Sequence, residues 1–156
     1  MANAATTQAN ANLTQAGAIK LYNNYFGTSW GNSTPWCAIF ASDMLHQAGM
    51  STKAHSAAAD YFNGYSPSFD KTYFTWIAAG STPRPGDIAV WNWDGALKST
   101  DGQHVNIVVS ATSAYGFTFV TGNSPSACGT AGVVCQASYS TTYTKKVLMG
   151  FARPIA

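Results

Sequence analysis

Charged residues are scarce in this chain. Only 9% of its 156 residues are Asp, Glu, Lys or Arg, and the net charge is +2. No block of Lys or Arg occurs, so the basic stripe that nucleic-acid binding needs is missing. No apolar run reaches the length of about 18 residues that spans a bilayer, and the start has no signal-peptide pattern. We therefore expect a soluble chain with neither nucleic acid nor membrane as a partner.

Apolar residues, by contrast, are abundant, at 46% of the chain with 13% aromatic. That content is ample for one buried core in a chain of this length. Residues 1–12 are Ala, Asn, Thr and Gln without an apolar pattern, and we expect a frayed or partly helical, flexible N-terminal arm there. Residues 13–156 are expected to form a single domain.

Cysteine is also rare, with three in the chain. Cys128 and Cys135 flank the segment GTAGVV and could close a small disulfide ring, or both could stay reduced. Cys37 has no cysteine near it in the sequence. An odd thiol of this kind is either a buried structural residue or a reactive one.

The first part of the chain reads as helical. Apolar residues recur at helical spacing over 13–26 and stop at Gly27. A second helix is predicted in PWCAIFASDMLHQA, with Thr34 as its cap, Pro35 at its first position and Gly49 after its end. A short helical stretch, HSAAADYF, follows within an otherwise mixed region.

After PRPGD the pattern changes to short strands, predicted at 88–93, 104–111, 117–122 and 145–154. Helices first and strands afterwards favour an α+β fold with an antiparallel sheet over alternating βαβ units.

Cys37 lies close to the start of the second predicted helix. Unpaired backbone N–H groups and the helix dipole favour a thiolate there, and the same groups could bind the oxyanion that forms when a thiolate attacks a carbonyl. Cys37 is therefore a candidate nucleophile, with a buried filler as the alternative.

A nucleophilic cysteine needs a base, and the chain has three histidines. On the same helix as Cys37, His46 falls about 13 Å along the axis and about 180° around it, so it cannot meet the thiol. His55 is expected to be a surface histidine in a loop. His104, at the start of the strand HVNIVVS, is the better base.

The segment 104–123 reads as a hairpin with its turn near 112–116. One natural register pairs His104 with Asn123, Asn106 with Thr121, Val108 with Phe119 and Ser110 with Phe117. Asn123 would then orient the imidazole as the third catalytic residue, and a register shifted by two residues would offer Thr121 instead.

No His, Cys or Asp spacing typical of a metal site occurs, so no metal is expected. The five tryptophans could stack on sugar rings, although most aromatic residues in such a domain are core. Trp36 and Trp93 are the best candidates for substrate contacts because they adjoin the catalytic elements.

Four stretches in order, PWCAIFASDMLHQAG, PRPGDIAVW, GQHVNIVVS and FTFVTGN, together resemble the CHAP family of cysteine, histidine-dependent amidohydrolases and peptidases. The resemblance covers residues 13–154. It implies a papain-like α+β fold in the peptidoglycan-hydrolase superfamily, with Cys37 as nucleophile at a helix start and His104 as base on the sheet. Acyl transfer by such a pair requires no cofactor.

The resemblance further implies hydrolysis of peptidoglycan, either between muramic acid and L-alanine or within the stem or bridge peptide. An extracellular or cell-wall location follows, which the protein would reach by secretion, by phage lysis or as part of a virion. A separate wall-binding domain or a virion assembly could supply targeting. Many members carry an acidic residue where this chain has Thr121. A catalytically weak wall-binding module, or an amidase or transferase acting on a non-wall amide, are the alternatives.

Overall fold

The computed structural model describes residues 1–50, 52–55, 57–61, 69–92, 103–139 and 147–155. In chain order the elements are α1 (Ala2–Asn10), α2 (Gln15–Phe26), α3 (Cys37–Gln47), the 3-10 helix η1 (Ala58–Tyr61), β1 (Phe74–Ala78), β2 (Ile88–Asn92), β3 (His104–Ala111), β4 (Phe117–Thr121), α4 (Pro125–Cys128), β5 (Cys135–Ser138) and β6 (Val147–Pro154).

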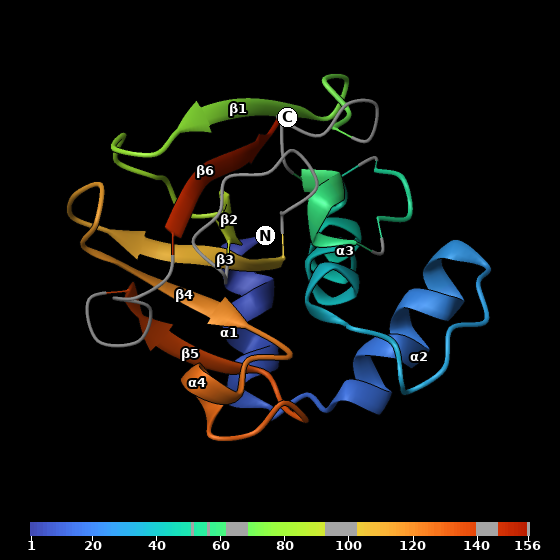
Figure 1. Ribbon diagram of the computed structural model, residues 1–156. Helices are drawn as coiled ribbons and strands as arrows, with labels where there is room; N and C mark the ends of the chain where they lie inside the picture. Colours follow the sequence, from blue (N-terminus) through green and yellow to red (C-terminus); the bar gives the residue numbers. More distant parts are fainter. Residues whose placement is uncertain (51, 56, 62–68, 93–102, 140–146, 156) are drawn as a thin grey trace.

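The strands form a six-stranded sheet in the order β1-β6-β2-β3-β4-β5, and every neighbouring pair is antiparallel. Helices α1 and α3 contact β3, and α2 packs on α3 (Figure 1). The α+β class with N-terminal helices on an antiparallel sheet, predicted from the order of helical and strand patterns, is confirmed.

Strand alternation divides the core between the two faces of the sheet. Val90 and Val105 point toward the helices and pack in one cluster with Cys37. Trp91 and Phe119 point to the opposite face, where they belong to an aromatic cluster. The helix face therefore holds the start of α3 against β2 and β3.

The ends of α2 match the sequence signals. Thr14 caps the helix by accepting a hydrogen bond from the Gly17 N–H at 3.2 Å, and Gly27 ends it in the left-handed region. The structure also confirms the helix that contains Cys37, but α3 begins at Cys37 itself, later than the predicted start at Pro35.

Trp36 explains the later start of α3. Its side chain is fully buried, its indole Nε1 donates to the Ala131 carbonyl at 3.0 Å, and its backbone is not helical (φ −118°, ψ 10°). A Cβ atom on Gly122 would come within 2.4 Å of the Trp36 ring, so Gly122 leaves the space that the ring occupies. The tertiary anchoring of this side chain sets the start of the helix.

The strands predicted from residue 88 onward correspond to β2, β3, β4 and β6. Two short strands at the edges of the sheet, β1 and β5, were not predicted. Both are partly exposed, and neither shows clean alternation of buried and exposed positions. The short helical stretch near residue 58 is present as η1.

Within residues 1–12, the segment expected to be a flexible arm, the structure contains α1. Its Ala5 is fully buried in the core cluster formed by α2, α3, β3 and β4. The small side chain of Ala5 allows this contact although the segment has no apolar stripe.

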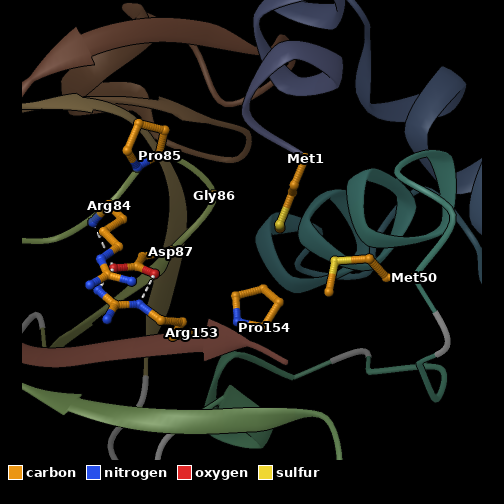
Figure 2. A pocket seen from close by; sticks show the side chains of 8 residues that line it. All are labelled: Met1, Met50, Arg84, Pro85, Gly86, Asp87, Arg153 and Pro154. Carbon is orange, nitrogen blue, oxygen red and sulfur yellow. Dashed lines mark hydrogen bonds and ion pairs between the residues drawn. The ribbon is translucent and has the colours of Figure 1, made fainter. Parts of the chain in front are cut away.

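Two links fix the parts of the chain around the sheet. Cys128 and Cys135 form a disulfide, as one of the two sequence alternatives predicted. The other link is an ion pair in which Arg153 Nε and an Arg153 guanidinium nitrogen donate to the two Asp87 carboxylate oxygens, each at 2.8 Å (Figure 2). Asp87 also accepts from the Arg84 N–H at 2.8 Å, so it ties the turn before β2 to β6.

Candidate active site

Cys37 is the first residue of α3 and is only 5% exposed. Its sulfur lies within hydrogen-bonding reach of the Val105 N–H, which belongs to the peptide group that joins His104 to Val105. The thiol therefore sits against the backbone at the start of β3.

Burial raises the pKa of the Cys37 thiol, and the N–H groups of Val105, Ala38 and Cys37 itself oppose that rise. The N–H groups at the helix start thus favour the thiolate as the sequence predicted, but the loss of solvation outweighs them. Cys37 is a protonated thiol at neutral pH in this structure.

His104 is the first residue of β3 and is 1% exposed. Its ring atom Nε2 lies 2.9 Å from the Thr121 hydroxyl oxygen. Burial lowers the pKa of His104 to about 3, so the imidazole is neutral at neutral pH. A neutral imidazole is the form that accepts a proton.

The hydrogen bond between Thr121 and His104 is linked to the tautomer of the imidazole, because Nε2 donates in one tautomer and accepts in the other. A hydroxyl has one hydrogen, and that of Thr121 is directed to the Gly122 carbonyl at 3.2 Å. With its hydrogen on the Gly122 carbonyl, the Thr121 hydroxyl accepts from His104, and in that arrangement Nε2 is the protonated nitrogen.

Asn123 follows two residues later, outside β4. It is half-buried and its backbone is in the left-handed region at φ 58°, which is uncommon for a residue other than glycine. Its proposed role as the group that orients the imidazole stays a prediction.

The strand register agrees with the sequence prediction over only part of the hairpin. Val108 pairs with Phe119 as predicted, and the turn falls between β3 and β4 as predicted. The predicted pairing of Ser110 with Phe117 is wrong, because an irregularity between Val108 and Ser110 shifts Ser110 opposite Thr118. The regular ladder also stops before it reaches His104.

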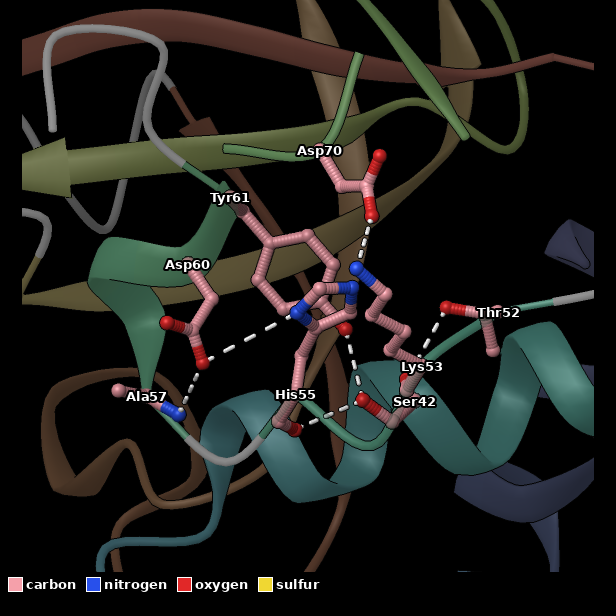
Figure 3. A network of polar contacts seen from close by, with 8 residues as sticks. All are labelled: Ser42, Thr52, Lys53, His55, Ala57, Asp60, Tyr61 and Asp70. Carbon is pink, nitrogen blue, oxygen red and sulfur yellow. Dashed lines mark hydrogen bonds and ion pairs between the residues drawn. The ribbon is translucent and has the colours of Figure 1, made fainter. Parts of the chain in front are cut away.

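The other two histidines have contacts of their own with α2, α3 and η1. The ring of His46 stacks on Tyr25, with ring centroids 4.0 Å apart. The expectation that His55 is a surface residue is wrong, because it is 5% exposed and packs against Tyr61. Its carbonyl accepts a hydrogen bond from the Ser42 hydroxyl at 2.8 Å (Figure 3).

Of the two tryptophans expected at the substrate, Trp36 is a core residue with no exposed surface. That prediction is corrected: the ring anchors the start of α3 and offers no face to a ligand. Trp93 lies outside the described residues. Trp30, which the sequence did not favour, is 43% exposed in the loop before α3.

A cavity of about 290 Å³ lies beside Met50, near the end of α3 remote from Cys37, and includes Arg84, Asp87 and Arg153 (Figure 2). It contains no candidate catalytic residue. In the described part of the chain, no three His, Cys, Asp or Glu side chains are grouped to hold a metal ion. No helix described here is long and apolar enough to cross a membrane.

Comparison with known families adds an independent observation. A family model for the CHAP domain matches residues 29–123, more than half of the chain. The chain belongs to the CHAP family. The match includes Cys37, His104 and Asn123, and CHAP proteins are generally cysteine and histidine-dependent amidohydrolases or peptidases that typically act on peptidoglycan. The comparisons with curated proteins and with solved structures found no match.

Proposed function

We propose that this CHAP domain hydrolyses an amide bond in the peptide part of peptidoglycan, with Cys37 as nucleophile and His104 as general base. The observation that carries the proposal is the position of the Cys37 sulfur against the His104–Val105 peptide group, at the start of a helix. The nucleophile therefore lies next to the backbone of the residue that carries the base, and the N–H groups at the start of α3 lie beside the thiol, where acyl transfer needs oxyanion donors.

In the first step His104 Nδ1 takes the thiol proton while the Cys37 sulfur attacks the amide carbonyl. The thiol and the imidazole both start neutral, so proton transfer accompanies the attack and no resting ion pair is needed. The N–H groups of Cys37 and Ala38 at the start of α3 are donors for the oxyanion of the tetrahedral intermediate.

In the second step protonated His104 gives its proton to the leaving amine, and a thioester on Cys37 remains. Water, deprotonated by His104, then attacks the thioester carbonyl. The products are a new amine and a new carboxylate, and Cys37 regains its proton.

We further infer that Thr121 orients His104 in place of the acidic residue common in the family. The support is the 2.9 Å contact between His104 Nε2 and the Thr121 hydroxyl. A neutral hydroxyl stabilises an imidazolium less than a carboxylate does, so this site should be slower than one with an acidic partner. Asn123 is a second candidate for the same role.

Two bonds fit this chemistry equally: the one between N-acetylmuramic acid and L-alanine, and an amide within the stem or bridge peptide. An extracellular or cell-wall location agrees with either, whether the protein is a secreted hydrolase or a phage lysin.

Purified Cys37→Ser protein is the test. It should bind walls but release no peptide or amine, whereas full hydrolysis by this variant would exclude the proposed nucleophile.

The other candidates are a wall-binding module and an amidase or transferase that acts on a different amide. A binding module would bind walls without releasing products from them. An enzyme for another amide would leave the walls intact while Cys37 still formed a thioester with its own substrate.

A further inference from the structure

Trp30 is unusual among the large apolar side chains of this protein. In the described part of the chain, three such side chains are exposed: Trp30 at 43%, Tyr115 at 53% and Ile155 at 46%. Trp30 alone among these lies in the loop that leads from α2 to Cys37 (Figure 1). A Trp side chain has an apolar face that can stack on a ligand and an N–H group that can donate a hydrogen bond.

The exposed ring is carried by a fixed backbone. The amide of Asn23 on α2 accepts from the Trp30 N–H at 3.0 Å and donates to the Trp30 carbonyl at 3.0 Å. The Thr28 hydroxyl also donates to the Asn23 side-chain oxygen at 2.7 Å. Because both backbone groups of Trp30 are held by one side chain, its exposure does not come from a loose loop.

A second side chain of α2 holds the rest of the loop. The Gln15 amide donates to the Asn32 carbonyl and, at 3.5 Å, to the Thr34 carbonyl. The loop is thus tied to α2 at both ends, and it continues directly into Trp36 and Cys37. The position of Trp30 is therefore fixed relative to the nucleophile.

The surroundings of Trp30 indicate the class of ligand. An open pocket of about 480 Å³ is lined by Thr28, Ser29 and Trp30, which provide one aromatic face, the Ser29 hydroxyl and a Thr28 hydroxyl that donates to Asn23 and is left as an acceptor. Residues 27–42 include no Asp, Glu, Lys, Arg or His. An anionic ligand such as a phosphate or a nucleic acid would require cations, whereas an uncharged sugar ring needs an aromatic face and hydroxyl partners.

We propose that Trp30, with the hydroxyls of Thr28 and Ser29, forms a saccharide subsite that binds an N-acetylated sugar of the peptidoglycan glycan strand. This inference rests on the proposed function for its choice of natural ligand. The indole would stack on the sugar ring, and the subsite would hold the glycan while an attached peptide reaches Cys37. Loss of the ring should then weaken substrate binding without changing the chemical step.

The test uses a soluble chito-oligosaccharide as the probe, because it carries N-acetylated sugars and no peptide. Binding is measured by calorimetry and by the indole N–H signals in NMR spectra. The variants are Trp30→Ala and, as a matched control, Tyr115→Ala, which removes another exposed aromatic ring from the distant β3–β4 turn (Figure 1). Circular dichroism checks that each variant is folded.

We expect the probe to bind the native protein and Tyr115→Ala alike, and Trp30→Ala at least tenfold more weakly. With walls as substrate, Trp30→Ala should raise KM several-fold and leave kcat nearly unchanged. No binding of the probe at millimolar concentration, or equal binding by Trp30→Ala, would overturn the subsite.

The subsite and the proposed reaction can fail separately. Trp30-dependent probe binding by a native protein that cuts no wall amide would keep the subsite and refute the proposed function. If wall hydrolysis depends on Cys37 but probe binding does not depend on Trp30, the proposed function is kept and the subsite is refuted. Cys37→Ser should retain the binding of the probe in full.

Discussion

His104 Nε2 lies 2.9 Å from the Thr121 hydroxyl, and that hydroxyl donates its own hydrogen to the Gly122 carbonyl. From these two contacts we infer that the imidazole is protonated at Nε2. In the proposed mechanism, protonation at Nε2 leaves Nδ1 to take the proton from Cys37. Thr121, where many members of the family carry an acidic residue, is therefore the residue that we propose to orient His104.

The first prediction tests this contact with two substitutions at one position. Thr121→Val keeps the shape of the side chain but removes the hydroxyl, whereas Thr121→Ser keeps the hydroxyl. Thr121→Val should lower kcat about tenfold or more with little change in KM, because it frees the tautomer and orientation of a catalytic group. Thr121→Ser should retain most activity, and the ¹⁵N shifts of His104 should report an Nε2–H tautomer only while the hydroxyl is present.

Asn123→Ala is the companion variant. It should cost less activity than Thr121→Val if Thr121 orients the ring. A larger loss from Asn123→Ala, with an unchanged His104 tautomer in Thr121→Val, would return the orienting role to Asn123.

The second prediction concerns Gly122, whose missing side chain leaves room for the Trp36 ring. A Cβ there would lie 2.4 Å from a ring carbon of Trp36, so Gly122→Ala must displace either the ring or the end of β4. Overpacking of this kind costs about 1–3 kcal/mol of stability. Because Trp36 directly precedes Cys37, activity should fall by more than the fraction of unfolded protein explains.

Gly132→Ala is the matched control for Gly122→Ala. A Cβ at Gly132 would approach only the Thr130 hydroxyl, at 3.7 Å, so this variant should unfold at nearly the native urea concentration. Equal stability and activity of the two variants would show that the Trp36 packing does not position the nucleophile.

The third prediction is the pH dependence of alkylation. Burial raises the pKa of the Cys37 thiol above its ordinary value, so the thiolate fraction grows only in the alkaline range. The rate constant for iodoacetamide should be low at pH 6–7 and rise steadily above pH 8, with Cys128 and Cys135 unmodified in their disulfide. A rate that is high and flat from pH 5 to pH 8 would instead reveal a resting thiolate–imidazolium pair.

The fourth prediction concerns Asp43, a buried residue of α3 whose carboxylate oxygens have no hydrogen-bond partner. Burial raises its pKa from 3.8 to about 8. Because the pKa of Asp43 is higher in the folded state, the stability linked to its proton is complete below the pKa of the unfolded chain. It is lost as the pH rises toward 8. The unfolded chain releases this proton first, so the free energy of unfolding should fall by about 1.4 kcal/mol per pH unit where Asp43 alone titrates.

The useful window for this measurement is pH 6.5 to 8. Below pH 6.5 the free energy of unfolding changes with pH in the opposite direction. The reason is that burial lowers the pKa values of His55 and His104. Asp43→Asn should abolish the decline in urea unfolding experiments across that window. An equal decline in native protein and in Asp43→Asn would assign the slope to other groups.

The sequence was informative wherever a local pattern determined the structure. Gly27 ends α2 because glycine adopts the left-handed conformation freely, and β3 alternates between the two faces of the sheet. The CHAP motifs placed Cys37 at a helix start and His104 at a strand start, where the structure has them.

The predictions that failed depended on tertiary contacts. Nothing local to Trp36 reveals that its indole would be buried against Gly122 and Ala131, which are distant in the sequence. The irregularity after Val108 arises from pairing between strands, so the hairpin sequence alone gave a regular register. His55 is buried by Tyr61 and by α3, which are contacts that the pattern of its own short segment does not specify.

Mass spectrometry of purified walls after digestion tests the central proposal most directly, because every amide cleavage leaves a new amine and a new carboxylate on identifiable fragments. The native protein should produce one type of new terminus, either muramic acid freed from L-alanine or a cut within the stem or bridge peptide. Neither Cys37→Ser nor His104→Ala should produce it. Fragments with only new glycan termini, or identical amide products from the native protein and Cys37→Ser, would contradict cysteine-dependent amide hydrolysis by this domain.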